Sequence, residues 1–169
     1  MIEAARLQWR DDQPFAPEYQ DIYHAPDGIA EVRRVFLQPS GMADLPVQRE
    51  TVRVGELGFG TGLNFAVLAE DCIARGQRLH FVSFEHRPLS AADMQRIADL
   101  RQTELPIYRE LNTLYPALIP GWHRRSLADG QITLSVYWGD AAAGLATLLQ
   151  QQRRGFSFWF LDGFCLLYT

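Results

Sequence analysis

From residue 52 the chain reads Val52-Arg-Val-Gly-Glu-Leu-Gly-Phe-Gly-Thr-Gly-Leu-Asn-Phe65. A short β-branched run is followed by three glycines at alternate positions, Gly58, Gly60 and Gly62, and then by an apolar helical pattern. This order predicts a strand, a tight turn and a helix. Glycine is needed where φ must be positive or where a ligand approaches the backbone. With Glu56 at the strand end, the stretch predicts a crevice that offers a carboxylate, backbone N–H groups and a helix N-terminus to a polar ligand.

The register of the glycines distinguishes two classes of cofactor. The G-x-G-x-x-G fingerprint of nicotinamide and flavin proteins cradles a pyrophosphate, whereas this chain has an acid, Glu56, followed by glycines at every second residue. An acid in that position disfavours a pyrophosphate and suits a positive group. S-adenosylmethionine carries an ammonium and a sulfonium but no phosphate, and the first loop of class I methyltransferases has this form. A nicotinamide-binding oxidoreductase and a turn that binds nothing remain the alternatives.

The overall composition is typical of a single globular domain. The chain has 169 residues, of which 47% are hydrophobic and 21% charged, so it can bury a sizeable core. It shows neither an apolar run of membrane-spanning length nor an N-terminal signal pattern. Cys72 and Cys165 form no motif, and the scattered histidines give no metal site, so we expect a cytoplasmic protein without a metal. The net charge of −4 is not that of a generally basic nucleic-acid binder.

Beyond the glycine stretch, apolar patterns alternate between strand and helix. We expect strands over 79–84, 132–137 and 156–161, and helices over 63–75, 91–103 and 141–152. Alternation of this kind predicts a Rossmann-like α/β fold, with a parallel sheet flanked by helices. Residues 1–50 are expected to form a lead-in to the single domain 1–169. This lead-in contains a possible strand at Leu7–Trp9 and a helix over 28–37 with Asp27 near its cap.

Four acids, Glu56, Glu85, Asp140 and Asp162, each follow a predicted strand. In parallel sheets, ligands bind at the carboxyl ends of the strands. A carboxylate at the end of the second strand, here Glu85, can accept the hydroxyls of a ribose. Any one of these acids could equally be a helix cap or a solvated turn. Their joint position favours a shared crevice.

Four segments together resemble the methyltransferase domain of the MnmC family, a bifunctional tRNA enzyme: Gly55–Phe65, Leu79–Glu85, Trp138–Asp140 and Trp159–Phe164. The resemblance runs from about residue 7 to residue 164. It implies a class I S-adenosylmethionine-dependent methyltransferase. The implied activity is transfer of a methyl group from S-adenosylmethionine to the amine of 5-aminomethyl-2-thiouridine at the wobble position of tRNA.

The same resemblance implies roles for individual residues. The methionine end of the cofactor would be shaped by Glu56, Gly58, Gly60, Gly62 and Asn64. Glu85 would hold the ribose, and Asp140 the adenine amine. Asp162, with Gly163 and Phe164, would lie where the target nitrogen meets the sulfonium. A carboxylate there, Asp162, could accept or orient the proton of the amine, and Phe164 could stack on a flipped uracil or simply be a core aromatic.

The chain departs from the family after residue 164. The family continues with a substrate loop and three further strands, and a separate FAD-dependent oxidase domain often follows, whereas this sequence reads Cys165–Thr169. We therefore expect a truncated domain without its C-terminal strands, and FAD only in the oxidase domain. The expected partners are tRNA and a fused or separate oxidase, with no membrane. A non-catalytic fragment that only binds nucleoside is the remaining alternative.

Overall fold

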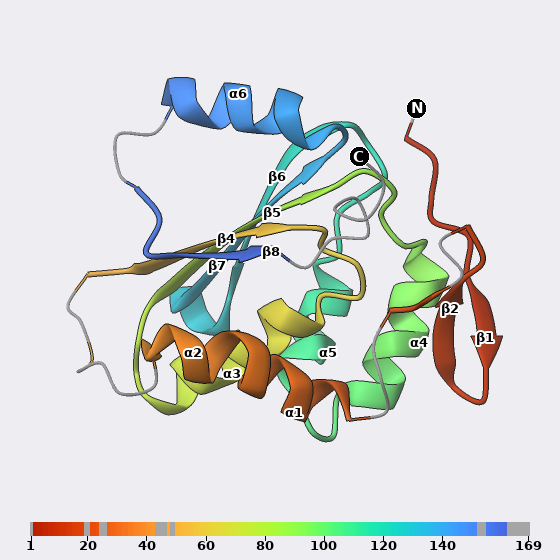
Figure 1. Cartoon of the computed structure of the whole chain (residues 1–169), viewed down its shortest axis with the longest axis horizontal. Coiled ribbons are helices and arrows are strands. Elements are labelled where there is room, and N and C mark those ends of the chain that lie inside the picture. The colour runs from red at the N-terminus through yellow and green to blue at the C-terminus, as the bar shows by residue number, and fades with distance from the viewer. Residues whose placement is uncertain are drawn as a thin grey trace.

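A computed structural model of the chain describes residues 2–18, 21–23, 27–42, 47, 50–151 and 155–161. Its centre is a five-stranded sheet in the order β6-β7-β5-β4-β8. The strands are β4 (Val52–Leu57), β5 (Leu79–Glu85), β6 (Gly121–Leu127), β7 (Ile132–Trp138) and β8 (Phe158–Leu161). The described helical segments are α1 (Gly28–Val32), η1 (Arg33–Leu37), α2 (Gln38–Ser40), α3 (Leu63–Ala74), α4 (Ala91–Arg101), α5 (Ile107–Thr113), η3 (Ala128–Gly130) and α6 (Ala141–Gln151). Helices α1 to α5 cover one face of the sheet and α6 the other, which confirms the Rossmann-like α/β fold (Figure 1).

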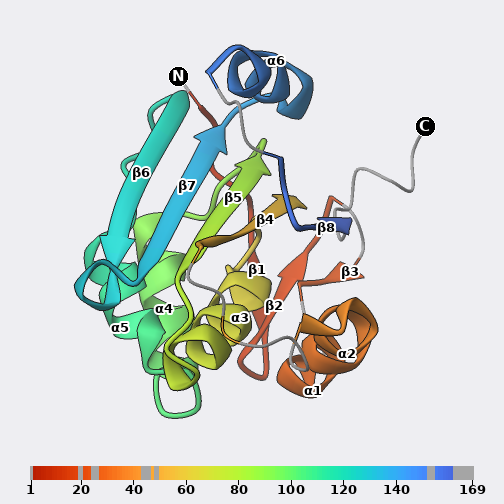
Figure 2. The ribbon, with the colours of Figure 1, turned by 90° about the vertical axis from the view of Figure 1, so that its left-hand side faces the viewer.

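The sheet is mostly, but not entirely, parallel. Strands β8, β4, β5 and β7 pair in parallel, whereas β6 pairs with β7 antiparallel, and its arrow points the opposite way in Figure 2. The parallel pairing of the four expected strands is confirmed, whereas the antiparallel strand at 121–127 was not expected from the sequence. Strand β6 forms an edge of the described sheet and carries Arg124 and Ser126 at exposed positions. Because polar residues interrupt its apolar pattern, the period-2 signal of a half-buried strand is weak.

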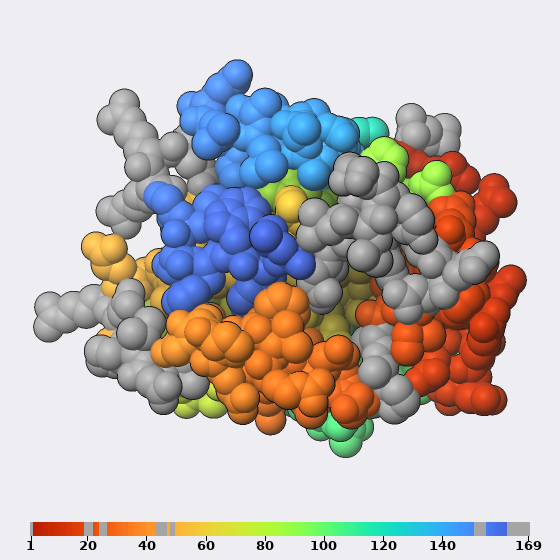
Figure 3. Space-filling view, in the orientation of Figure 1, coloured from red at the N-terminus to blue at the C-terminus, as the bar shows by residue number. Residues whose placement is uncertain are grey.

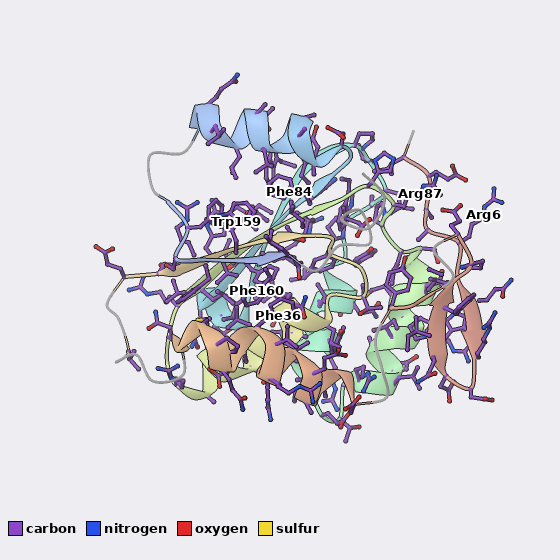
Figure 4. The ribbon with its side chains drawn as sticks, in the orientation of Figure 1. Arg6, Phe36, Phe84, Arg87, Trp159 and Phe160 are labelled. Atoms are coloured by element: carbon purple, nitrogen blue, oxygen red, sulfur yellow. The ribbon has the colours of Figure 1, made fainter. Side chains whose placement is uncertain are left out.

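Two apolar layers hold the helices to the sheet. On the α1–α5 side, the ring of Phe36 from η1 packs on Phe160 of β8, with the centroids 4.7 Å apart. On the α6 side, Phe84 of β5 stacks with Trp159 of β8 at 6.5 Å. Figure 4 shows these two pairs on opposite sides of the sheet. Central strands buried on both faces are near-continuously apolar in sequence, which is why β5 was predictable.

The N-terminal lead-in is more regular than expected. Strands β1 (Gln8–Arg10), β2 (Gln13–Ala16) and β3 (Asp21–Ile22) form a separate antiparallel sheet, of which only the first strand was predicted. The helix expected over 28–37 is present, but its second half, η1, is a π-helical turn, and Asp27 makes no side-chain capping bond. None of the described helices has the length and apolar character needed to cross a membrane.

Candidate functional site

The loop from Gly58 to Gly62 joins β4 to α3 at the carboxyl edge of the sheet. Its three glycines have φ of +89°, +52° and +75°, a region that residues with a side chain rarely adopt. The alternate spacing in the sequence is therefore explained by backbone conformation. Phe59 lies between the first two glycines. Its side chain is buried, and its ring centroid is 6.0 Å from the ring centroid of Trp138. This contact fixes the loop to the end of β7.

The N–H groups of the three glycines already have acceptors within the protein. Gly58 N donates to Phe84 O at 2.9 Å and Gly62 N to Phe59 O at 2.8 Å. Gly60 N donates to Glu85 Oε2 at 2.9 Å. The N–H groups of these three glycines are therefore engaged within the protein and are not open to a diphosphate.

Glu85, at the end of β5, is held against this loop. Besides the bond from Gly60, its Oε1 accepts a hydrogen bond from the backbone N of Arg87 at 2.8 Å. Burial raises the pKa of the Glu85 carboxyl, and the N–H groups of Gly60 and Arg87 oppose that rise because they stabilise the charged form. A carboxylate has only acceptor oxygens when ionised, so this position suits hydroxyl donors or a cation and repels a phosphate.

Glu56 has a different environment. Its side chain is 1% exposed, and it accepts hydrogen bonds from Asn64 Nδ2 at 3.0 Å and from Ser83 Oγ at 2.7 Å. The carboxylate thereby joins β4 to the first turn of α3 and to β5. The carboxylate that was expected to face the crevice is bonded to Asn64 and Ser83 in the structure. Sequence reasoning missed Ser83, although a serine inside the apolar run of β5 was a signal of a buried hydrogen bond.

The other predicted site residues are placed only in part. Asp140 follows β7 and its Oδ1 accepts from Ala143 N at 2.9 Å, so its side chain caps α6. Gly139 N donates to Glu85 O at 2.9 Å, which brings the start of this turn beside the end of β5. The structure therefore gathers the glycine loop, Glu85 and the β7–α6 turn at one edge. The predicted residues Asp162, Gly163 and Phe164 lie outside the described residues.

Two tyrosines that were not selected from the sequence bond to backbone carbonyls near the site, one of them in the glycine loop. Tyr108 of α5 is fully buried and its hydroxyl donates to Thr61 O at 3.2 Å. Tyr115 donates to Leu89 O at 3.2 Å and packs 6.0 Å from Trp138. Burial raises the pKa of both phenols, so both remain neutral donors. Nothing in the sequence around either tyrosine indicated this role.

These features define a Rossmann-like α/β protein whose first crossover carries a glycine loop next to an acid. Similarity to known proteins narrows this class. No family model matches the chain. The tRNA 5-methylaminomethyl-2-thiouridine biosynthesis bifunctional protein MnmC of Acidovorax sp. (strain JS42) is 40% identical over 163 residues, which are 94% of this chain and 25% of that protein. MnmC of Thiobacillus denitrificans is 39% identical over 171 residues, covering 96% of the chain and 26% of that protein.

The chain is therefore homologous to proteins of the MnmC family over nearly all of its own length. It spans about a quarter of the length of these relatives. Among solved structures, MNMC2 from Aquifex aeolicus superimposes with a TM-score of 0.65 over 96% of this chain and 50% of that chain, at 22% identity. At that identity the likeness supports the fold alone.

Proposed function

We propose that the chain binds S-adenosylmethionine at the glycine loop and transfers its methyl group to the amine of 5-aminomethyl-2-thiouridine at the wobble position of tRNA. The observation that carries this proposal is the Glu85 carboxylate, held 2.9 Å from Gly60 N at the carboxyl edge of the sheet. The homologous MnmC proteins, whose name refers to 5-methylaminomethyl-2-thiouridine in tRNA, supply the substrate.

The site fits a nucleoside without phosphates better than a dinucleotide. The N–H groups of the three glycines bond to protein acceptors, so they are not open to a diphosphate. Glu85 would accept the ribose hydroxyls, and the glycine loop would let the backbone approach the ligand closely. These features disfavour the nicotinamide-binding alternative.

The protein would catalyse this reaction mainly by holding the two reactants in position and would form no covalent bond with either of them. The lone pair of the neutral amine attacks the methyl carbon, the carbon–sulfur bond breaks with its electrons passing to sulfur, and the amine loses a proton. Holding both partners in line can contribute several kcal/mol, of the order of 7–11 in favourable systems. We assign the proton to a carboxylate acceptor at Asp162, which follows the last strand in sequence. Gly163 and Phe164 would lie beside the target base, and Asp140 would bind the adenine amine.

Calorimetric titration and a transfer assay test the proposal together. Purified chain is titrated with S-adenosylmethionine and, separately, with NADH. It is then incubated with isotopically labelled S-adenosylmethionine and with tRNA from cells that lack the final methylation, and the nucleosides are identified by mass spectrometry. We expect binding of S-adenosylmethionine only, and labelled 5-methylaminomethyl-2-thiouridine.

The Glu85→Gln variant tests the site, because glutamine carries no charge and its single side-chain oxygen can accept from only one of Gly60 N and Arg87 N. We expect weaker S-adenosylmethionine binding by this variant, together with a small loss of thermal stability from the N–H group that is left without its acceptor. Binding of NADH in place of S-adenosylmethionine would refute the proposal. Tight S-adenosylmethionine binding without any transfer would instead identify a non-catalytic nucleoside-binding fragment.

A further inference from the structure

Tyr23, in the N-terminal lead-in, lies against the glycine loop. Its ring atoms Cδ1 and Cε1 are 3.2 and 3.4 Å from the point that a Cβ on Gly60 would occupy. Gly60 is also the residue whose N–H holds Glu85. A tyrosine ring and a carboxylate thus flank the same residue, although Tyr23 follows β3 of the small sheet and Glu85 ends β5 of the central sheet.

Backbone hydrogen bonds fix the position of this tyrosine. Tyr23 N donates to Pro14 O at 3.0 Å, directly after the β2–β3 pairing in which Phe15 lies opposite Ile22. The ring therefore extends from an ordered strand end and not from a freely moving tail. The side chain of Tyr23 is partly exposed.

Side chains then dock the whole lead-in onto the loop and helix that follow β5. Trp9 Nε1 donates to Asp93 Oδ1 at 3.0 Å, and the guanidinium of Arg96 lies 4.1 Å from the Trp9 ring centroid. Glu18 forms an ion pair with Arg87, which lies on the side of the molecule that carries the hairpin (Figure 4). The backbone N of Arg87 also donates to Glu85. Arg87 therefore contacts the lead-in through its side chain and the candidate site through its backbone.

From this geometry we infer that Tyr23 is a ligand-binding residue whose ring forms the outer wall of the nucleoside site at Gly60. The inference rests on the proposed function and adds a residue to it. A nucleoside bound over the glycine loop beside Glu85 packs on the tyrosine face, and a positively charged sulfonium is attracted by the same face. The lead-in is then part of the binding site and not only an extension that precedes the domain.

A purely structural role makes a different prediction. If Tyr23 only packs the lead-in against the loop, its loss lowers stability, and binding falls only as a consequence. Phe15 offers a matched comparison, because it lies in the same small sheet and packs with the Arg10 guanidinium 3.5 Å from its ring centroid, on β1. Truncating Phe15 disturbs the lead-in without removing a ring from the glycine loop.

The test compares wild type, Tyr23→Ala, Tyr23→Phe and Phe15→Ala by calorimetric titration with S-adenosylmethionine and by thermal unfolding. We expect Tyr23→Ala to raise Kd about tenfold, the size of one lost aromatic stacking contact, and Tyr23→Phe to stay within about twofold of wild type. Phe15→Ala should lower Tm while leaving Kd within about twofold of wild type.

Equal affinity of Tyr23→Ala and wild type would overturn the inference and leave the proposed function intact. So would a loss of affinity in Phe15→Ala as large as that in Tyr23→Ala, since that result would trace the effect to the fold of the lead-in. Failure of the wild-type chain to bind S-adenosylmethionine would instead overturn the proposed function, and the role of Tyr23 with it.

Discussion

At the scale of residues, Glu56 and Glu85 were both expected at strand ends, yet Glu56 lies within β4 and Glu85 is the last residue of β5, so their surroundings differ. Glu56 is 1% exposed and bonded to two side chains, whereas Glu85 is bonded to backbone N–H groups of the loops at the sheet edge. The first carboxylate connects elements of the core, and the second faces the candidate site. A substitution at Glu56 should therefore affect folding first, and one at Glu85 should affect binding first.

The Glu56→Ala variant should be destabilised by about 2–4 kcal/mol, because Asn64 and Ser83 each lose an acceptor in a buried environment. Urea unfolding monitored by circular dichroism measures this change. Glu50→Ala is the matched control, since Glu50 is exposed and its loss should change stability by about 0.5 kcal/mol or less. A Glu56→Ala variant as stable as the control would show that the buried hydrogen bonds contribute little.

His80 predicts a pH dependence of stability. Burial, assisted by the guanidinium groups of Arg53 and Arg124, lowers the pKa of the His80 imidazole to about 4, against about 6.5 in an unfolded chain. Between these values the unfolded chain binds a proton that the folded protein does not, so stability falls as pH decreases from about 6.5 to 4. After allowance for solvent screening, we expect the loss to be roughly 2 kcal/mol.

Urea unfolding at pH 7 and pH 5 measures the part of that loss that occurs above pH 5, in wild type and in His80→Gln. Glutamine can keep a hydrogen bond to Ser135 Oγ, which lies 2.9 Å from His80 Nε2, but it does not titrate. The variant should therefore lose less stability than wild type between the two pH values. Identical losses would mean that other groups account for the whole pH dependence.

At the scale of elements, packing of α6 on the sheet reverses an ordinary helix preference. Alanine in place of glycine usually stabilises a helix by about 0.5–1 kcal/mol. A Cβ on Gly144, however, would lie 2.7 Å from ring atoms of both Phe84 and Tyr137, closer than carbon atoms can approach without displacement. We expect Gly144→Ala to be destabilising by about 1–3 kcal/mol.

Ala146→Gly on the exposed side of α6 provides the reference for helix preference alone, and it should cost about 0.5–1 kcal/mol. Thermal unfolding of both variants gives the comparison. If Gly144→Ala raises Tm, then α6 can shift away from the sheet at little cost, and the close packing on Phe84 does not hold it in place.

The sequence predicted those elements in which local pattern and tertiary role agree. The loop at 58–62, strand β5 and the end of the helix predicted over 63–75, which Gly76 follows with φ of +69°, are explained by glycine conformation and by burial on both faces. Strand β6 escaped prediction because an edge strand has little apolar alternation, and β3 because two residues are too short to show a period. The contact of Tyr23 with Gly60 joins residues 37 positions apart, so no local pattern could reveal it.

At the scale of the whole molecule, the two faces of the sheet are covered unequally. Helices α1 to α5 lie on one face, and in the described part of the chain α6 lies on the other (Figure 1). Residues 155–161, which include β8, appear at the surface between α6 and the α1–α2 segment (Figure 3). Trp159 and Leu161 of this strand are 40% and 58% exposed. An apolar strand at the edge of a sheet is a template for pairing with another chain.

We therefore expect the chain to self-associate as its concentration rises, and Leu161→Lys to reduce this association, because a charge on an edge strand opposes strand pairing between molecules. Sedimentation velocity over a concentration series measures the effect. Leu149→Lys is the matched control, since Leu149 is 78% exposed but lies on α6, away from any strand edge. Equal reductions by both variants would point to general hydrophobic contact, whereas an effect of Leu161→Lys alone assigns the association to β8, because only that residue lies where backbone groups can pair.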